Sequence, residues 1–255
     1  MTSCADTRRP VFSSFKTPQI PTPELSFVMP CFNESESIEE GIRTWISFAR
    51  EARLNFELVV VNDGSNDGTS RILDHLRRDK PELRVIHGLH EGYARALKRG
   101  CLAARGTSIA QIDAAGRFMP SDFSRLWEMR EKADLILGMR THRLDRLRER
   151  GLSCCVRLMN RVLHRVVLRD PETPFRVYRR DVMECYLPHV RMEASLNNAL
   201  TVLVAKKHPD RIVEVPIPYR VPIRGERNLG LVAWAILAIQ EFRQLFRLRP
   251  LAAIR

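Results

Sequence analysis

Three apolar runs of the sequence end in clusters of small, acidic and amide residues that could bind a nucleotide. The clusters are Pro30-Cys-Phe-Asn-Glu34, Asn62-Asp-Gly-Ser-Asn-Asp-Gly-Thr69 and Asp113-Ala-Ala-Gly116. The two glycines of the second cluster permit turn conformations closed to other residues, and Asp63 directly follows its apolar run. A carboxylate at that place can accept hydrogen bonds from a ribose or a base. Taken alone, this cluster also fits a turn followed by a helix cap.

The segments that would position these clusters alternate between strand and helix. The pattern predicts strands over 25–29, 56–61, 83–86, 108–112 and 135–137, with helices between them. The almost continuous apolar run 56–61 is typical of a strand buried on both faces. Such alternation predicts an α/β fold with a mainly parallel central sheet flanked by helices. Because ligands bind beyond the carboxyl ends of such strands, we expect the three clusters to meet at one edge.

Helix starts and the distal half are predicted from local signals. Ser37 and Glu40 have the spacing of a capping box, and Asp67 or Thr69 can cap the next helix. Beyond Gly138 the pattern predicts a helix, a strand, a helix, a strand and an amphipathic C-terminal helix. These lie over 152–166, 175–178, 196–203, 212–215 and 229–248. We expect a flexible leader at 1–24, one domain at 25–228, and a basic amphipathic tail at 229–255.

Composition excludes several classes of protein. With 44% hydrophobic residues the chain can build a core, which excludes collagen-like, coiled-coil and wholly disordered chains. The longest strongly apolar stretch, 229–239, is shorter than the roughly 20 residues of a spanning helix. The six cysteines form no C-x-x-C pair, and residues 1–24 lack a signal-peptide pattern, so we expect reduced thiols in a cytoplasmic protein.

The charge of the chain points to phosphate-bearing partners. The net charge is +12, and all but six of the 42 basic residues are arginines. The guanidinium fork pairs with phosphate oxygens in bidentate fashion, although a solvated basic face gives the same composition. We expect no nucleic-acid partner, because the chain has no zinc-finger spacing, no aromatic RNA-binding platform and only 7% aromatic residues.

Taken together, the clusters resemble the family 2 glycosyltransferases of the GT-A fold, a Rossmann-like architecture. The similarity is greatest to the branch that contains dolichol-phosphate mannose synthase and polyprenyl-phosphate glycosyltransferases. Besides the strand-end clusters, the matching segments run in family order over roughly 25–245. They are Gly92-Tyr-Ala-Arg-Ala-Leu-Lys-Arg-Gly100, Gln111-Ile-Asp-Ala114, Gly138-Met-Arg140, Pro174-Phe-Arg-Val-Tyr-Arg-Arg180, Glu214-Val-Pro216 and Arg224-Gly-Glu-Arg227.

The resemblance implies a role for each matching position. A nucleotide pocket would be lined by Pro30, Phe32, Asn33, Glu34 and Ala114. Asp63 would bind the base or ribose, and Asp113 would face the ribose and diphosphate. Arg140 would approach the phosphates or the acceptor, and Arg224 and Arg227 would lie in a basic loop that closes over phosphate. Arg176 and Asp170 are weaker candidates, because Phe-Arg-Val-Tyr also fits a structural strand.

One departure from the family concerns the metal. The family's D-x-D motif supplies a second acid that helps hold a divalent cation, Mg²⁺ or Mn²⁺, but here Ala115 takes that place and Arg117 follows. Of the motif's ligands only Asp113 remains, and hard cations need several oxygen ligands. In one interpretation Arg117, with Arg140 and Arg224, neutralises the departing diphosphate in place of the metal. In the other, the chain is a pseudoenzyme that binds a nucleotide-sugar without turnover.

The resemblance implies an inverting transfer of sugar from a GDP- or UDP-linked donor. A polyprenyl-phosphate acceptor is already anionic at pH 7, so catalysis would be alignment and charge stabilisation. A sugar hydroxyl acceptor would instead need a carboxylate base, for which Asp134, Asp145 and Glu193 are candidates. The tail could lie at a cytoplasmic membrane surface with its arginines toward lipid phosphates, or pack on the domain.

Overall fold

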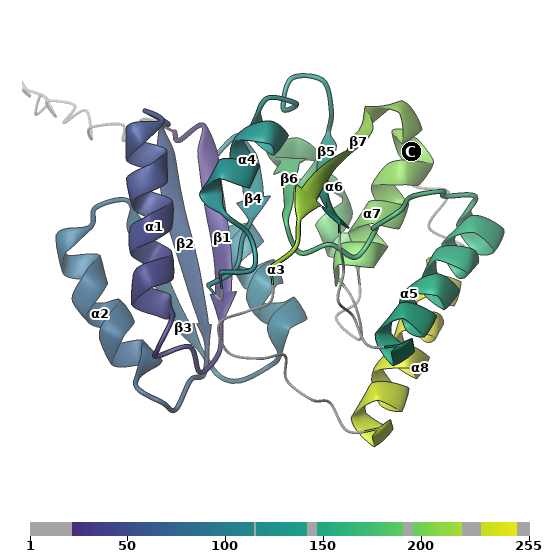
Figure 1. Ribbon diagram of the computed structural model, residues 1–255, viewed down its shortest axis with the longest axis horizontal. Coiled ribbons are helices and arrows are strands. Elements are labelled where there is room, and N and C mark those ends of the chain that lie inside the picture. Colours follow the sequence, from purple (N-terminus) through teal and green to yellow (C-terminus); the bar gives the residue numbers. More distant parts are fainter. Residues whose placement is uncertain (1–21, 115, 142–146, 191–195, 221–230, 249–255) are drawn as a thin grey trace, which may run out of the picture.

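The alternating runs build a seven-stranded sheet with helices on both faces (Figure 1). The computed structural model describes residues 22–114, 116–141, 147–190, 196–220 and 231–248. The strand order is β3-β2-β1-β4-β6-β5-β7. The strands are β1 (Leu25–Cys31), β2 (Phe56–Asp63), β3 (Leu83–Gly88), β4 (Ser108–Gln111), β5 (Leu135–Thr141), β6 (Arg176–Arg179) and β7 (Ile212–Pro218). All neighbours pair in parallel except β6, which is antiparallel to both β4 and β5. The predicted mainly parallel α/β sheet is confirmed.

Helices cover the sheet in the predicted places, and one further helix, α6, was not predicted. In chain order they are α1 (Ile38–Glu51), α2 (Thr69–Asp79), α3 (Tyr93–Ala103), α4 (Pro120–Trp127), α5 (Leu147–Met159), α6 (Arg180–Tyr186), α7 (Leu196–Lys207) and α8 (Leu231–Arg247). Short turns η1 (Asn160–His164), η2 (Leu187–His189) and η3 (Pro209–Arg211) extend three of the helical segments. In the part of the chain that the structure describes, no helix combines the length and apolarity that a bilayer crossing requires.

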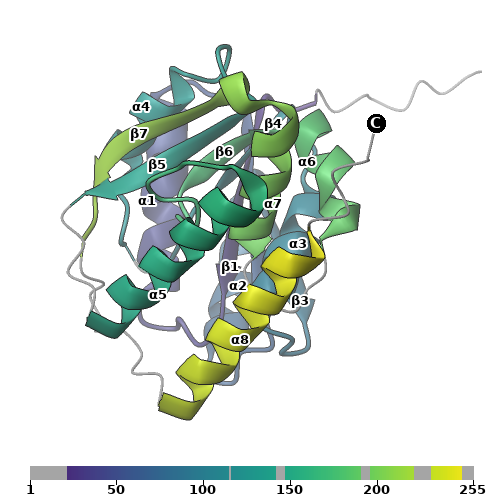
Figure 2. The same ribbon diagram turned by 90° about the vertical axis from the view of Figure 1, so that its right-hand side faces the viewer.

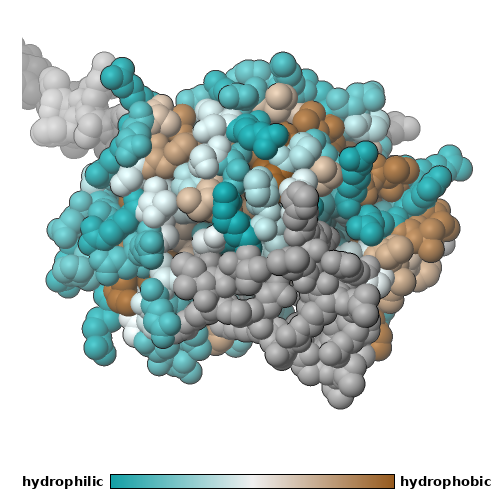
Figure 3. Space-filling model, viewed as in Figure 1, coloured by the Kyte–Doolittle hydropathy of each residue, from teal (hydrophilic) through white to brown (hydrophobic). Residues whose placement is uncertain are grey.

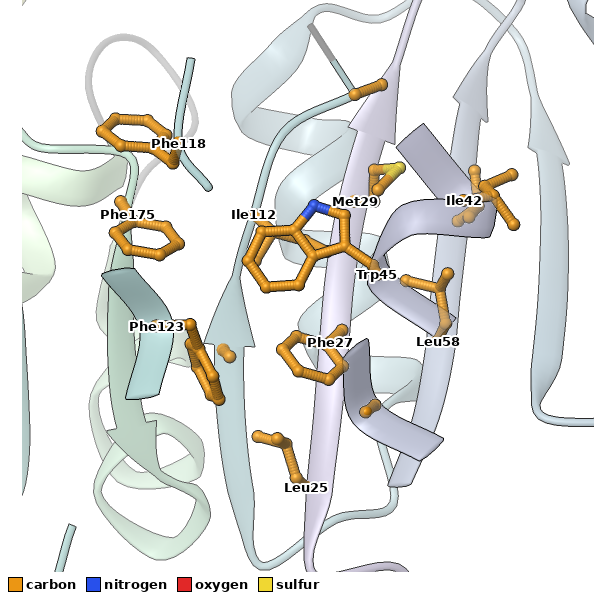
Figure 4. Packing of buried hydrophobic residues seen from close by; sticks show 14 of the residues in the cluster. Leu25, Phe27, Met29, Ile42, Trp45, Leu58, Ile112, Phe118, Phe123 and Phe175 are labelled. Atoms are coloured by element: carbon orange, nitrogen blue, oxygen red, sulfur yellow. The ribbon is translucent and has the colours of Figure 1, made fainter. Parts of the chain in front are cut away.

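Alternate side chains of each central strand enter two separate cores. Phe27 on β1 contacts Trp45 of α1 and Phe123 of α4, with ring centroids 5.2 and 5.0 Å apart, in the core that Figure 4 shows. Val28, the next residue, belongs to the core on the other face, together with Leu97 of α3. This period of two explains why a continuous apolar run forms a strand that is buried on both faces.

Neither α1 nor α2 begins with the side-chain cap that the sequence predicted. The capping box at Ser37 and Glu40 is wrong, because the Ser37 hydroxyl donates to Glu34 Oε2 (2.8 Å) and makes no cap bond. At α2 the prediction of Asp67 or Thr69 as the cap is also wrong, because the N-cap is Gly68 and no side chain makes a cap bond. Asp67, one residue earlier, accepts the Thr69 N–H through Oδ1 at 3.1 Å. The spacing alone could not reveal that Glu34, inside the preceding loop, competes for the Ser37 hydroxyl.

A buried carboxylate connects three strands at the amino-terminal edge of the sheet by hydrogen bonds. Glu57 of β2 is 2% exposed and accepts hydrogen bonds from Ser26 Oγ (2.7 Å), Arg84 Nη1 (2.8 Å) and the Arg105 backbone N–H (2.6 Å). Burial alone would raise the pKa of Glu57, but these hydrogen bonds outweigh it and lower the pKa below its ordinary value. The ionised carboxylate therefore stabilises the start of β1, β2 and β3 together.

The distal helices pack against the second core. Nearly every residue of α7 is buried, as expected for a helix enclosed on all sides. Leu245 and Leu248, at the end of the tail helix, are buried in the same core as Val156 of α5. One side of α8 therefore packs on the domain, which was one of the two alternatives for the tail. The domain boundaries at residues 24 and 228 stay predictions.

Candidate active site

Strands β1, β2, β4 and β5 all run in one direction, so the loops that follow them share one edge of the sheet. The arrowheads of β1 and β2 point to this edge in the lower part of Figure 1. The three sequence clusters therefore meet there, as predicted from the parallel pattern.

The loops after β1 and β2 are tied together by hydrogen bonds. The Asn33 N–H donates to Ser65 Oγ (2.9 Å), and Asn33 Oδ1 accepts the Asn66 N–H (2.9 Å). Asn33 has a φ of 54°, in the left-handed region that asparagine tolerates better than most residues. The Ser35 N–H donates to Asp67 Oδ2 at 3.1 Å. Each loop thus fixes the conformation of the other, and Phe32 and Glu34 remain half-buried between them.

Asp63 is engaged by the loop that follows β3. Its carboxylate, 3% exposed, accepts the backbone N–H groups of Glu91 (3.0 Å) and Gly92 (2.9 Å), directly before α3. His90 Nδ1 lies 2.8 Å from Asp63 Oδ2. The residue after Asp63 has to be glycine. Gly64 has a φ of +70°, and a Cβ at this position would lie 2.5 Å from the backbone nitrogen of His90. Asp63 therefore holds the β3–α3 loop against the site, while its predicted contact with a base or ribose stays a prediction.

Phe32 and His90 form an aromatic pair at the same edge. Their ring centroids are 4.0 Å apart and their planes are inclined by 21°. The His90 side chain is 56% exposed, so the pair presents a flat surface to solvent beside Asp63. Sequence reasoning missed His90, although its place just after the third predicted strand could have drawn attention to it.

Asp113 follows β4 as a carboxylate without hydrogen-bond partners among the described residues. Both of its oxygens are buried, and Arg117 Nε lies 3.5 Å from Asp113 Oδ2. Burial raises the pKa of Asp113 to about 6; the Arg117 guanidinium lowers it, and the charge of Glu34 adds a smaller upward effect. A buried carboxylate with free acceptors is suited to receive hydroxyl donors, such as those of a ribose.

Arg140, the last residue but one of β5, is held by Asp170. Arg140 Nε and Nη2 donate to the two Asp170 oxygens at 2.7 and 2.8 Å, and the Arg140 backbone N–H donates to Oδ2 at 3.1 Å. The guanidinium also lies over the Tyr219 ring, 5.7 Å from its centroid. Tyr219 in turn contacts Phe118, with centroids 5.9 Å apart. Packed aromatic rings thus connect the segment after Asp113 to Arg140.

Comparison with known proteins decides the family. The model of glycosyl transferase family 2 matches residues 26–187. The chain belongs to this family. It is 22% identical over 235 residues to the dolichyl-phosphate beta-glucosyltransferase ALG5C of Trichomonas vaginalis, covering 84% of this chain and 69% of the relative. It is 30% identical over 166 residues to an undecaprenyl-phosphate 4-deoxy-4-formamido-L-arabinose transferase of Pseudomonas fluorescens, covering 64% of this chain and 49% of the relative. The predicted resemblance to the polyprenyl-phosphate branch is confirmed.

Solved structures confirm the fold. Glucosyl-3-phosphoglycerate synthase of Mycobacterium tuberculosis, solved with phosphoglyceric acid, has a TM-score of 0.67 at 19% identity, covering 88% of this chain and 79% of that one. The same enzyme has been solved with Mn²⁺, UDP-glucose and glycerol 3-phosphate, with a TM-score of 0.65 at 19% identity and the same coverage. This glycosyltransferase therefore has the GT-A-like fold that its strand pattern predicted.

The predicted site residues of this family 2 glycosyltransferase fall into three groups. Phe32, Asn33, Glu34, Asp63, Asp113, Arg117 and Arg140 all lie in or directly beside the loops at the carboxyl edge. Pro30 and Ala114 are buried beneath it, and Ala114 lies so close to α1 that a Cβ on Gly41 would meet its carbonyl oxygen at 3.2 Å. Ala115, Arg224 and Arg227 lie outside the described residues.

Arg176 has a structural role. Its side chain is fully buried at the start of β6, where Nε donates to the Thr173 carbonyl (2.6 Å) and Nη1 to Asn197 O (3.0 Å) and Thr201 Oγ1 (2.9 Å). These neutral acceptors connect the β6 start to α7. The Phe-Arg-Val-Tyr segment is therefore the structural strand that was the alternative to a substrate contact.

The described residues do not fit a divalent metal by themselves. Asp113 is the one carboxylate of its motif, and the group beside it is the guanidinium of Arg117. Asp122, on the following helix, is already paired with Arg220 at 2.9 Å. Within the described ranges no three His, Cys, Asp or Glu side chains gather in a way that could hold a metal ion. A divalent metal ion requires several oxygen ligands, whereas this site offers one carboxylate with a guanidinium beside it.

Asp134, one of the candidate bases, lies at the opposite edge of the sheet from the predicted site. Asp134 precedes β5 there and is 4% exposed; its Oδ1 accepts bonds from Arg179 (3.0 Å) and Arg211 (2.9 Å). A groove of about 460 Å³ at this edge is lined by self-paired charges such as Arg180 and Glu184. Asp134 is therefore wrong as a candidate base, and Asp145 and Glu193 lie outside the described residues.

Proposed function

We propose that this glycosyltransferase moves a sugar from a nucleotide-sugar to a polyprenyl phosphate, with inversion at the anomeric carbon. The names of the dolichyl-phosphate and undecaprenyl-phosphate transferases to which it is similar support the acceptor. The solved neighbour with UDP-glucose supports a UDP-linked donor as the first to test, with GDP-linked sugars second. The observation that carries the proposal is the convergence of two interlocked loops and Asp113 at one edge of the sheet.

In this reaction an anionic oxygen of the acceptor phosphate attacks the anomeric carbon of the donor. The bond between that carbon and the donor's phosphate oxygen breaks, and the nucleoside diphosphate leaves with the electron pair. No proton has to be removed from the acceptor, so the site needs no strong base. The work of the protein is alignment of the two phosphates and stabilisation of charge on the leaving group.

Each half of the donor has a counterpart among the residues at the edge. The Phe32–His90 surface offers a face on which a nucleobase stacks. Asp63 and the β3–α3 loop that it holds would lie against the base and ribose. Asp113 would accept hydrogen bonds from ribose hydroxyl groups. Pro30, Ala114 and the Asn33–Glu34 loop would form the pocket floor and wall, as the family resemblance implies.

Charge on the leaving diphosphate would be neutralised by arginines. Arg117 faces Asp113 and would contact the diphosphate, while Arg140, oriented by Asp170, would receive the acceptor phosphate. Arg224 and Arg227 stay sequence-based candidates for the basic loop. The described residues do not fit a divalent cation, so in this proposal the arginines supply the positive charge. Mn²⁺ bound with UDP-glucose is reported for the solved neighbour, and the same metal is to be tested here.

Transfer to a lipid-linked phosphate would place the reaction at a membrane surface, and the expected side is cytoplasmic, where nucleotide-sugars are made. The test is a screen of UDP- and GDP-sugars with detergent-dispersed undecaprenyl or dolichyl phosphate, with and without EDTA. We expect equal amounts of nucleoside diphosphate and glycosylated lipid, with the anomeric configuration inverted. Asp113→Asn should lose transfer, whereas Asp79→Asn, an exposed change on α2, should not. Transfer to none of the lipid phosphates would refute the proposal.

A further inference from the structure

Exposed apolar side chains are concentrated on two helical segments away from the active site. Of the ten large apolar side chains that are exposed among the described residues, six lie on or just after α5–η1, or on α8. They are 50–73% exposed, and they are Leu158, Val162, Val167, Ile236, Ile239 and Phe246. Single exposed apolar residues are normal, but a cluster of this kind marks an interaction surface.

The two segments lie side by side. His164 Nε2 of η1 is 2.9 Å from the Leu245 carbonyl oxygen of α8, and Val156 and Leu245 share one core. Figure 2 shows α5 and α8 next to each other on the flank that faces the viewer. In Figure 3 hydrophobic surface is visible on this flank, at the right-hand side. The exposed residues of both segments therefore belong to one flank of the molecule.

The exposed apolar residues follow helical stripes that point away from the core. On α8, Ile236, Ile239, Arg243 and Phe246 are three or four residues apart, and all four are exposed. Leu245, on the other side of the same helix, is 1% exposed. Both α5–η1 and α8 therefore have apolar side chains in solvent in addition to the apolar side chains that pack on the core, such as Val156 and Leu245.

Several arginines lie on the same segments as these apolar residues. Residues 151–169 contain four arginines and no Asp or Glu, and α8 contains two arginines and one Glu. Arg161, Arg165, Arg243 and Arg247 are exposed. The side chains of the first three make no hydrogen bond or ion pair with any described residue, whereas Arg43, Arg95 and Arg180 on other helices each pair with an acid four residues away. The flank thus combines exposed apolar groups with uncompensated positive charge.

We propose that this amphipathic face, the six apolar residues with Arg161, Arg165, Arg243 and Arg247, docks into the head-group layer of an anionic bilayer. The apolar side chains enter the acyl boundary, and the guanidinium groups pair with lipid phosphates. A second copy of the chain fits less well, because a two-fold contact through this face would bring arginines of like charge together. Docking of this face would bring the active site to the membrane that contains a lipid-linked acceptor. This link to the acceptor rests on the proposed function, whereas vesicle binding itself does not.

The test is co-sedimentation of the full chain with vesicles that contain neither donor nor polyprenyl phosphate. We expect binding to phosphatidylcholine vesicles that contain phosphatidylglycerol and weak binding to phosphatidylcholine alone. Because each arginine near an anionic surface contributes about fivefold to partitioning, Arg161→Glu/Arg165→Glu should weaken binding by about 30-fold or more. The matched control is Arg71→Glu/Arg78→Glu, which changes charge equally on α2, at the other side of Figure 1, and should retain binding.

A second pair of variants tests the apolar component. Leu158→Ser/Val162→Ser removes two apolar side chains without changing charge and should also weaken binding to anionic vesicles. Absence of wild-type binding, or equal losses in both arginine double variants, would overturn the proposal. So would a dimer in sedimentation velocity that Leu158→Ser/Val162→Ser dissociates while vesicle binding is unchanged. Transfer in detergent without vesicle binding refutes this proposal alone, and vesicle binding without transfer refutes the proposed function alone.

Discussion

Replacing Arg117 with glutamine tests how the active site handles the charge of the leaving diphosphate. The change keeps a polar side chain of similar length but removes the cation 3.5 Å from Asp113. The site then holds a buried carboxylate without the charge of Arg117 beside it, facing a donor that carries two phosphates. We expect turnover to fall because the departing diphosphate loses its counter-charge and meets the Asp113 carboxylate instead.

The size of the effect follows from the distance and the exposure. A diphosphate charge about as far from Arg117 as the Asp113 carboxylate is would interact with it by about 5 kcal/mol at an effective dielectric constant near 20, and by about 1 kcal/mol in water. Arg117 is 38% exposed, so water screens part of this interaction. We therefore take about 2 kcal/mol, which corresponds to roughly a 30-fold loss in kcat/KM.

The assay is lipid-phosphate glycosylation in EDTA and in Mn²⁺, with a double-mutant cycle. Wild-type turnover should be the same in both, and Arg117→Gln should recover part of its loss in Mn²⁺, because Asp113 and the donor phosphates can then share the ion. Arg117→Gln/Asp113→Asn should lose less than the two single losses combined, since the residues act as a pair. Arg43→Gln, a surface change on α1, should have no effect. Strict metal dependence of the wild type, or unchanged kcat/KM of Arg117→Gln in EDTA, would show that the reasoning is wrong.

Three further predictions concern binding and stability. Phe32→Ala removes the ring stacked on His90 and should weaken binding of the donor's nucleoside diphosphate about tenfold by calorimetry, whereas Phe32→Trp should retain it; equal affinity in all three proteins would exclude the stacking surface. Asp170→Asn leaves Arg140 without its 2.7 Å partner and should lower the free energy of unfolding by about 3 kcal/mol in urea; no change would mean that solvent already screens the pair. Glu57→Gln should destabilise the protein at pH 7. The pKa of Glu57 is lower in the folded than in the unfolded chain, so its contribution is present above the ordinary pKa of 4.5 and disappears as pH falls through the folded value. The difference between Glu57→Gln and wild type in urea should therefore shrink in acid, and a pH-independent difference would contradict this.

The sequence by itself determined the fold class and the place of the site. Apolar runs such as 56–61 and the helical period of α1 are local properties, and they identify strands and helices without knowledge of their partners. Once the strands are taken as parallel, the Asn62–Thr69 segment and Asp113 must share one edge. The motif order then predicted the family, which the match over 26–187 confirmed.

Only the tertiary structure decided what each polar group of the site binds. Asp63 is held by the backbone of residues 91 and 92, and Arg140 by Asp170, partners that are 28 to 30 residues away in sequence. His90 becomes part of the site through its contact with Phe32, and Arg176 leaves the site because α7 encloses it.

The amphipathic face on α5–η1 and α8 likewise depends on two helices that are more than 60 residues apart in sequence. The spacing of residues predicts whether a segment is a helix or a strand and where its turns lie, because these properties depend on neighbours along the chain. The partner of a side chain depends instead on which distant segments the packed core brings into contact, and no local spacing carries that information.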